Sequence, residues 1–142
     1  MEKRDVKVCA PMFVKVFTSP PWEYHWVTED KARRYIEDIL ITPGSLCFLY
    51  YEESKLLGFC LGAVSDYFLE AQYEIKEFGI LPQSQRQGSG SRMLGRIEEY
   101  LAESKIYSIF LHTSKNAPAY GFYVKNNYML VENSVYLAKS VQ

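Results

Sequence analysis

The sequence has few of the features that mark membrane, secreted or nucleic-acid-binding proteins. Its 142 residues carry a formal net charge of −1, so it lacks the basic excess with which a general nucleic-acid binder displaces counterions. No apolar run approaches the roughly 20 residues that span a bilayer, and the N-terminal MEKRDVKV lacks a signal-peptide core. We therefore expect a cytoplasmic protein that binds neither nucleic acid nor membrane.

Cysteine and histidine are also scarce. The three cysteines, Cys9, Cys47 and Cys60, are an odd number in apolar surroundings, which suits reduced core thiols better than disulfides. The two histidines lie far apart, and no spacing resembles a metal-binding motif, so no metal site is expected. What remains is an ordinary globular composition, and the length is that of a single domain over residues 1–142.

In the first half of the chain, hydrophobic periodicity predicts two helices followed by a hairpin. We expect helices at about 5–18 and 28–40, the first capped by Asp5 and strained by Pro11, the second capped by Thr28. The segments 45–51 and 56–64 are expected to pair as strands around a turn at 52–55. A polar and aromatic connection, 65–72, then leads into the next strand.

In the second half, strands and helices alternate. A strand at 73–81 precedes a long amphipathic helix that reaches about Leu101, and a buried strand follows at 106–112. Ser114 or Asn116 is expected to cap a further helix, which ends by Asn127 in the left-handed conformation. Segments 128–131 and 135–138 are expected to close the sheet as a last hairpin.

The rest of the predicted domain is built around residues 73–101, which read as a strand, a turn and a helix. Between its strand and its helix lies the turn Gln85-Arg86-Gln87-Gly88-Ser89-Gly90, whose glycines permit a tight bend and close approach of a ligand to the backbone. The helix start carries no acid, and three arginines (Arg86, Arg92 and Arg96) lie around it. Positive side chains at the positive end of a helix dipole are unfavourable unless an anion completes the site. The pattern indicates a phosphate ligand; the alternative is an ordinary strand-to-helix turn.

Two blocks carry a family resemblance. The segment from Glu74 to Gly90 resembles the acetyl-CoA-binding motif of the GNAT N-acetyltransferase superfamily, including its Leu-Pro pair. The later segment NAPAYGFYVKNNY, from Asn116 to Tyr128, is similar to the family signature N-x-x-A-x-x-F-Y-x-K-x-G-F. The resemblance implies an α/β (α+β) fold, with a mixed, mostly antiparallel sheet flanked by about four helices. Because only Met1–Arg4 precede the first helix, the family's first strand is expected to be short or missing.

The resemblance also implies acetyl-CoA as co-substrate. Its phosphates would be held by residues of the turn (Gln85, Arg86, Gln87, Gly88, Ser89, Gly90 and Ser91), and its pantetheine arm would lie along the backbone near Phe78 and Ile80. An amide of that strand could polarise the thioester oxygen. Asn116 matches a residue that contacts CoA, although a helix cap is an equally physical role for it.

Acetyl transfer to an amine needs a base and an acid. An alkylamine has a pKa near 10.4, so only about one molecule in a thousand is neutral at pH 7. Glu74 matches the base of the protein-lysine branch of the family, and Glu77 matches an acid common in the small-molecule branch. Strand alternation predicts that the two carboxylates lie on opposite faces, and either could instead pair with Lys76 or an arginine. Tyr123 matches the family's general acid; core packing is the alternative role.

The aromatic segment SPPWEYHWV is the expected acceptor loop. It resembles the P-P-W-x-x-x-W segment of small-molecule acetyltransferases related to aminoglycoside modifiers. Trp22, Tyr24 and Trp26, together with Asp66 and Glu70, would suit a cationic amine through cation–π and Coulomb attraction. The alternative is that both tryptophans anchor the loop to the core.

These observations predict an acetyl-CoA-dependent N-acetyltransferase that acts on a primary amine of a small cationic molecule. No cysteine lies in either motif, which favours direct transfer in a ternary complex over an acetyl-enzyme. Two alternatives stay open: acetylation of a protein N-terminus or lysine, and a non-catalytic acyl-CoA-binding sensor. The sequence leaves the oligomeric state open between a monomer and a homodimer.

Overall fold

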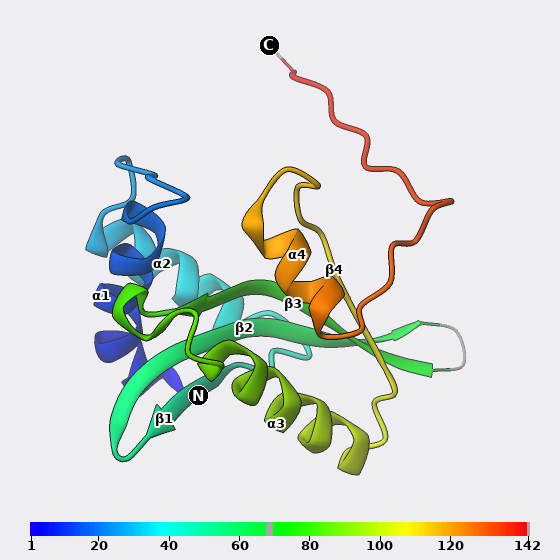
Figure 1. Cartoon of the computed structure of the whole chain (residues 1–142), viewed down its shortest axis with the longest axis horizontal. Helices are drawn as coiled ribbons and strands as arrows, with labels where there is room; N and C mark the ends of the chain where they lie inside the picture. The colour runs from blue at the N-terminus through cyan, green and yellow to red at the C-terminus, as the bar shows by residue number, and fades with distance from the viewer. Residues whose placement is uncertain (68–69, 142) are drawn as a thin grey trace. The chain divides into compact units, whose positions relative to one another are not determined.

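The computed structural model describes residues 1–67 and 70–141, which divide into two compact units, Met1–His112 and Thr113–Gln142. The first unit contains the whole sheet and three of the α-helices, and the second contains one short helix (Figure 1). In chain order the elements of the first unit are η1 Lys3–Asp5, α1 Val6–Thr18, α2 Glu29–Leu40, β1 Phe48–Glu52, β2 Lys55–Tyr67, β3 Glu70–Ile80, η2 Pro82–Ser84, α3 Ser89–Glu103 and β4 Ser108–Leu111. The second unit contains α4, Pro118–Lys125.

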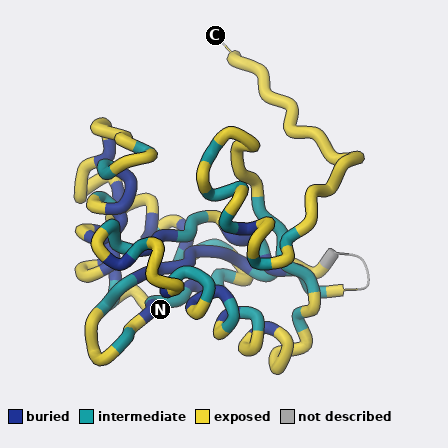
Figure 2. Tube along the Cα trace, in the orientation of Figure 1, coloured by how far each residue is buried: buried dark blue, intermediate teal, exposed yellow. Residues whose placement is uncertain are grey.

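The sheet is mixed and mostly antiparallel, as predicted. Its strand order is β1-β2-β3-β4, with antiparallel pairs except between β3 and β4, which are parallel. Helices α1 and α2 pack on one face: a Cβ added at Gly79 of β3 would meet Val16 of α1 and Phe59 of β2. Helix α3 packs on the other face, where a Cβ added at Gly58 would meet Met93. Buried residues accordingly follow the strands and the inward sides of these helices (Figure 2).

The two N-terminal helices form where their periodicity predicts. In α1 the buried side chains recur every three or four residues and join a core shared with α2, Phe59 and Leu61. Thr28 caps α2 as expected, accepting from the Lys31 amide at 3.3 Å. Asp5 precedes α1 but does not cap it, because its carboxylate accepts from the Glu2 amide at 2.7 Å. The residues before α1 form a 3₁₀ turn, so the described N-terminus contains no strand.

A bulge in β3 changes the predicted geometry of the central strand. Leu61 and Gly62 are consecutive in β2, whereas their partners in β3 are Glu77 and Ile75, so Lys76 is an extra residue. Glu77 therefore pairs with Leu61 and Glu74 pairs with Ala63, two β2 residues that lie on the same face. The prediction that Glu74 and Glu77 lie on opposite faces was wrong, because the bulge shifts the alternation by one residue.

Three further predictions for the strands needed correction. The segment expected as a connection at 65–72 instead extends β2 and β3 as far as the pair Tyr67–Glu70; residues 68–69 lie outside the described part. Strand β4 is shorter than expected, and its residues are half-buried and not buried. The last hairpin is not formed: residues 126–141 contain no strand, and Met129, Val135 and Leu137 are exposed.

The second unit corrects one more prediction and confirms another. Helix α4 begins after Ala117 without a side-chain cap, so neither Ser114 nor Asn116 caps it. Asn127 ends the helical segment in the left-handed conformation, with φ of 67°, as expected.

The cysteines are free and buried, as predicted. Burial raises the pKa of both Cys9 and Cys60 to about 12, so these thiols stay protonated and unreactive near neutral pH. None of the helices in the described part of the chain has both the length and the apolarity needed to span a bilayer.

Candidate active site

The turn after β3 leaves the start of α3 open to an anion. Gly88 occupies the N-cap position with a left-handed φ of 81°, and it has no side chain that could cover the first-turn amides. The first turn, with Ser89, Gly90 and Ser91, contains no acid. The Gln85 side-chain amide donates to the Ile80 carbonyl at 2.9 Å, which ties the turn to the end of the strand. A phosphate at such a helix start would be stabilised by backbone amides and the helix dipole.

The arginines around this turn have different roles. Arg92 pairs with Glu52 of β1 at 2.8 Å, and it also donates to the Gln87 carbonyl at 3.1 Å and the Ser89 hydroxyl at 3.1 Å. Hydrogen bonding to Arg92 holds the pKa of the Glu52 carboxyl below its usual range. The charge of Arg92 is therefore balanced within the chain and shapes the turn. Arg86 is exposed and makes no ion pair with any described residue, so it is the cation of the turn available to a ligand.

The end of β3 extends beyond its parallel neighbour. The last pair between β3 and β4 is Ile75 with Leu111, whereas β3 continues through Phe78 to Ile80. The bulge at Lys76 coincides with the point where β4 ends. The segment from Phe78 to Ile80, predicted to lie along the pantetheine arm, therefore lies beyond the end of β4. It leads through η2 to the turn from Gln85 to Ser91, which we call the phosphate turn after its predicted ligand.

On the α1/α2 face, an apolar pocket of about 370 Å³ adjoins β3. Side chains come from α1, from the aromatic loop, from α2 and from β3, and all belong to the first unit. Seven of the lining residues are aromatic or aliphatic: Phe13, Phe17, Tyr24, Trp26, Val27, Ala32 and Tyr35. The other two, Lys31 and Glu77, are charged. The pocket has the size and apolar character typical of sites for small organic ligands.

Glu77 is the carboxylate of this pocket. The Tyr35 hydroxyl of α2 donates to its Oε1 at 2.8 Å. Burial raises the pKa of Glu77 above the usual range for glutamate, and the hydrogen bond from Tyr35 acts in the opposite direction. Burial likewise raises the pKa of Tyr35, with a contribution from the charge of Glu77, so the hydroxyl remains a donor. A half-buried carboxylate with a raised pKa is a suitable proton acceptor at neutral pH.

Glu74 lies on the same face but in a different environment. Its Oε2 lies 3.3 Å from the ammonium of Lys76. The sequence left open that either glutamate pairs with Lys76 or an arginine, and Glu74 does pair with Lys76. Its charge also contributes to the raised pKa of Tyr35, which is consistent with both carboxylates lying toward α2. Of the two predicted bases, Glu77 is the one that lines the pocket.

The three aromatic residues of the loop have separate roles. Trp22 is half-buried and packs against the core, which is the anchoring alternative. Tyr24 stacks on Phe17 with ring centroids 6.3 Å apart and on Trp26 with centroids 5.6 Å apart. Trp26 is 65% exposed and lines the pocket, so it does not anchor the loop.

Asp66 and Glu70 are not brought to this pocket. Both are exposed and lie near the far end of the β2–β3 hairpin. Asp66 lies five residues along β2 from Leu61, the partner of Glu77, a separation of about 17 Å at the usual rise per residue. Strand pairing through this segment, which the sequence did not indicate, separates them from the aromatic loop.

Several lining residues were missed from the sequence. Phe13, Phe17, Lys31 and Tyr35 were treated only as parts of amphipathic helices. Their helical spacing shows which of them share a helix face, but only the packing of α1 and α2 on the sheet shows that they line one pocket with Glu77.

Tyr123 and Asn116 belong to the second unit. Tyr123 is buried, with its ring centroid 5.1 Å from that of Phe122 and 5.3 Å from that of Tyr128. Asn116 is exposed, and its backbone amide donates to the Ser114 hydroxyl at 3.3 Å. Their roles in the reaction therefore stay predictions.

Known structures share this fold. A possible acetyltransferase from Clostridium difficile 630 superposes with a TM-score of 0.78 at 14% identity, covering 100% of this chain and 95% of that one. An aminoglycoside acetyltransferase from an uncultured soil metagenomic sample, in complex with sisomicin, gives a TM-score of 0.73 at 16% identity, with coverage of 100% and 93%. The aminoglycoside N-acetyltransferase AAC(6')-Iy in complex with CoA gives 0.73 at 14%, with coverage of 99% and 92%.

At these identities the structural likeness concerns the fold alone, and no curated protein matches the sequence. The family model for the acetyltransferase (GNAT) family, however, matches residues 13–128, which include both motifs and the pocket. The chain belongs to the acetyltransferase (GNAT) family and is an N-acetyltransferase.

Proposed function

We propose that this protein transfers the acetyl group of acetyl-CoA to a primary amine of a small cationic molecule, with both substrates bound together. The observation that carries the proposal is the position of Glu77, a half-buried carboxylate in an aromatic pocket on the strand that leads into the phosphate turn. Family membership supports acetyl-CoA as the donor.

The pocket supports capture and deprotonation of the amine. The exposed faces of Tyr24 and Trp26 attract an ammonium group through cation–π contact. The raised pKa of Glu77 brings its proton affinity closer to that of the amine, which makes it a better base than an ordinary glutamate. Tyr35 holds one carboxylate oxygen and leaves the other for the incoming N–H.

The proposed transfer is a single displacement at the thioester carbonyl. The bound ammonium first gives one proton to Glu77, which releases it to water. The neutral amine nitrogen then forms a bond to the carbonyl carbon, the C–S bond breaks with its electron pair remaining on sulfur, and the second N–H proton goes to Glu77. A backbone amide near the end of β3 stabilises the developing charge on oxygen. Tyr123 donates the proton that the departing thiolate takes, as the resemblance implies. Cys9 and Cys60 are too basic and too buried to carry the acetyl group between the substrates.

The donor site proposed here consists of the turn from Gln85 to Ser91 and the strand end at Phe78 and Ile80. The side-chain-free N-cap at Gly88 and the absence of a first-turn acid favour phosphate at the start of α3. Arg86 supplies an exposed positive charge, while Arg92 keeps the turn attached to β1. Gln85 and Gln87 stabilise the turn through hydrogen bonds to backbone carbonyls.

The test is a CoA-release assay with acetyl-CoA and a panel of amines, beside melting curves with CoA and with desulfo-CoA. We expect CoA to be released only when amine is present, and both CoA compounds to raise the melting temperature by mass action. A melting shift without turnover on any amine or peptide would identify the sensor alternative. Turnover on peptides but no small amine would identify the protein-acetylating alternative. No shift with either CoA compound would refute the donor site.

A further inference from the structure

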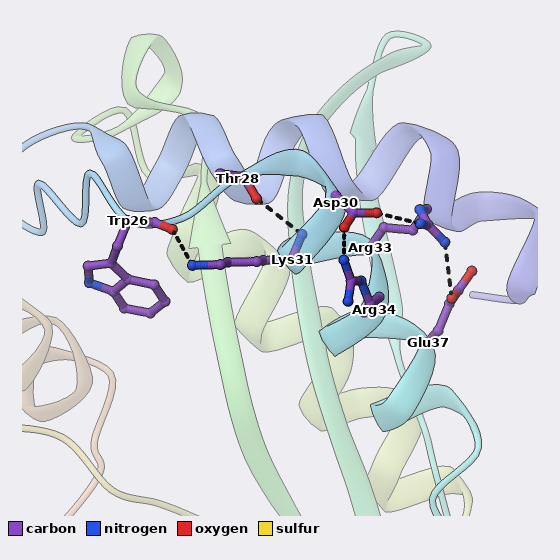
Figure 3. Close-up of polar contacts among 7 residues, drawn as sticks. All are labelled: Trp26, Thr28, Asp30, Lys31, Arg33, Arg34 and Glu37. Carbon is purple, nitrogen blue, oxygen red and sulfur yellow. Dashed lines mark hydrogen bonds and ion pairs between the residues drawn. The ribbon is translucent and has the colours of Figure 1, made fainter.

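The charges of the pocket are arranged for one ammonium group. Among the described residues that line it, Glu77 is the one carboxylate and Lys31 the one cation. The Lys31 ammonium donates to the Trp26 carbonyl at 3.3 Å, so it is held where the aromatic loop meets α2 (Figure 3). A ligand ammonium at Glu77 would complete an opposite-charge pair, whereas a second ammonium group near Trp26 would meet the positive charge of Lys31.

Among the residues that the structure describes, no other carboxylate lines the pocket. Three of the other carboxylates of α2 and β3 are already engaged by cations: Asp30 by Arg33 and Arg34, Glu37 by Arg33, and Glu74 by Lys76. Figure 3 shows the α2 pairs lying along the helix beyond Lys31. A polycation would therefore bring more positive charge than the pocket can neutralise.

The remaining surface of the pocket is suited to an apolar body. Phe17, Tyr24 and Trp26 form a stacked series, with neighbouring centroids 6.3 Å and 5.6 Å apart. Phe13 and Ala32 also line the pocket and offer no hydrogen-bonding side chains. Ligand hydroxyl groups that face Phe13, Phe17 and Ala32 would lose hydrogen bonds to water without replacing them, at a cost of about 1–3 kcal/mol for each unpaired group. An aromatic or aliphatic ligand would gain from burial in the same place.

We propose, building on the function proposed above, that the acceptor is a monoamine whose single amino group is carried on an aromatic or aliphatic body, as in arylalkylamines. Glu77 binds the amino group, the aromatic series binds the body, and Lys31 selects against a second positive charge. The aminoglycosides named for the structural neighbours are polyhydroxylated polycations, and this pocket is unsuited to them.

Matched amine pairs test this selection. Pentylamine and cadaverine share a five-carbon chain and differ by one ammonium group, and phenethylamine is compared with kanamycin. We expect kcat/KM to be at least about tenfold higher for the monoamine of each pair, because like charges placed together are strongly unfavourable. Lys31→Met should reduce the pentylamine preference severalfold. Lys7→Met, at an exposed lysine of α1 outside the pocket, should leave the preference unchanged.

A binding measurement separates this proposal from the function on which it rests. Fluorescence of the exposed Trp26, with Trp26→Phe as the control for assignment, reports amine binding to the CoA complex without requiring turnover. Phenethylamine binding without acetylation would support the ligand class and refute acetyl transfer. Acetylation of kanamycin or cadaverine in preference to their monoamine partners would support acetyl transfer and refute the ligand class. An unchanged preference in Lys31→Met would refute the role of Lys31, and failure of every monoamine to bind would overturn the proposal.

Discussion

Replacing Glu77 with glutamine separates its chemical role from its packing. Glutamine keeps the shape of the side chain and the oxygen that accepts the Tyr35 hydroxyl at 2.8 Å, but it cannot take a proton from the amine. A general base typically contributes about 10²- to 10⁴-fold. We therefore expect Glu77→Gln to lower kcat/KM by that factor, equivalent to about 3–5 kcal/mol of transition-state stabilisation.

The same change should not destabilise the fold. Burial raises the pKa of Glu77, so the folded protein binds this proton more tightly than the unfolded chain does. Ionisation of Glu77 therefore opposes folding, and its effect grows as pH rises from the unfolded pKa through the raised folded pKa. Glutamine removes this effect. Glu77→Gln should melt at the same temperature as the wild type or higher at neutral pH, and the difference should shrink in acid.

Steady-state kinetics with phenethylamine and melting curves at several pH values provide the assay. Glu74→Gln is the matched variant on the same face, and we expect a smaller loss of activity because Glu74 already pairs with Lys76. Glu103→Gln, at an exposed acid at the end of α3, is the control. Full activity in a folded Glu77→Gln protein, beside a large loss in Glu74→Gln, would transfer the role of base to Glu74. A parallel fall in activity and melting temperature for Glu77→Gln would indicate a structural role.

Four further variants test the site. Tyr35→Phe removes a hydrogen-bond donor that lowers the pKa of Glu77, so the acid limb of the pH profile of kcat/KM should move to higher pH. Tyr107→Phe, at an exposed tyrosine, is the control. If both variants leave the profile unmoved, Glu77 is not the base that the profile reports. Gly90→Val, at a helical position of α3, should weaken CoA binding in calorimetry with little effect on folding, and unchanged affinity would refute the phosphate turn. Gly88→Val should also weaken binding and in addition destabilise the fold by about 1–2 kcal/mol or more, because its φ of 81° is left-handed. Tyr123→Phe should lower kcat by about 10²- to 10⁴-fold at unchanged acetyl-CoA affinity, whereas normal turnover in a folded variant would exclude it as the general acid.

The local elements of this protein were predictable because their signals lie within a few residues. The strand and helix around Gly88 follow from apolar periodicity and from a glycine that tolerates a left-handed φ. The Thr28 cap and the left-handed Asn127 follow from side-chain chemistry at helix ends. The last hairpin was not predictable in this way: the apolar runs at 128–131 and 135–138 permit strands, but a strand forms only beside a partner edge.

The arrangement of the pocket proposed for the acceptor was decided by tertiary structure. The sequence identified Glu77, Tyr24 and Trp26, but it could not show that α1 and α2 pack so that Phe13, Lys31 and Tyr35 line the same pocket as Glu77. Those contacts join residues up to 64 positions apart, the separation of Phe13 and Glu77, and no local pattern encodes them.

The sequence by itself thus determined the family motifs, the glycine turn proposed to bind phosphate and the types of residue available for catalysis. Tertiary structure decided which of those residues meet. The extra residue Lys76 places Glu74 and Glu77 on one face, and the pairing of β2 with β3 carries Asp66 and Glu70 away from the pocket. Strand register depends on the balance of hydrogen bonds and packing across the whole sheet, so a one-residue bulge reverses the facing of a side chain without any signal in the sequence around it.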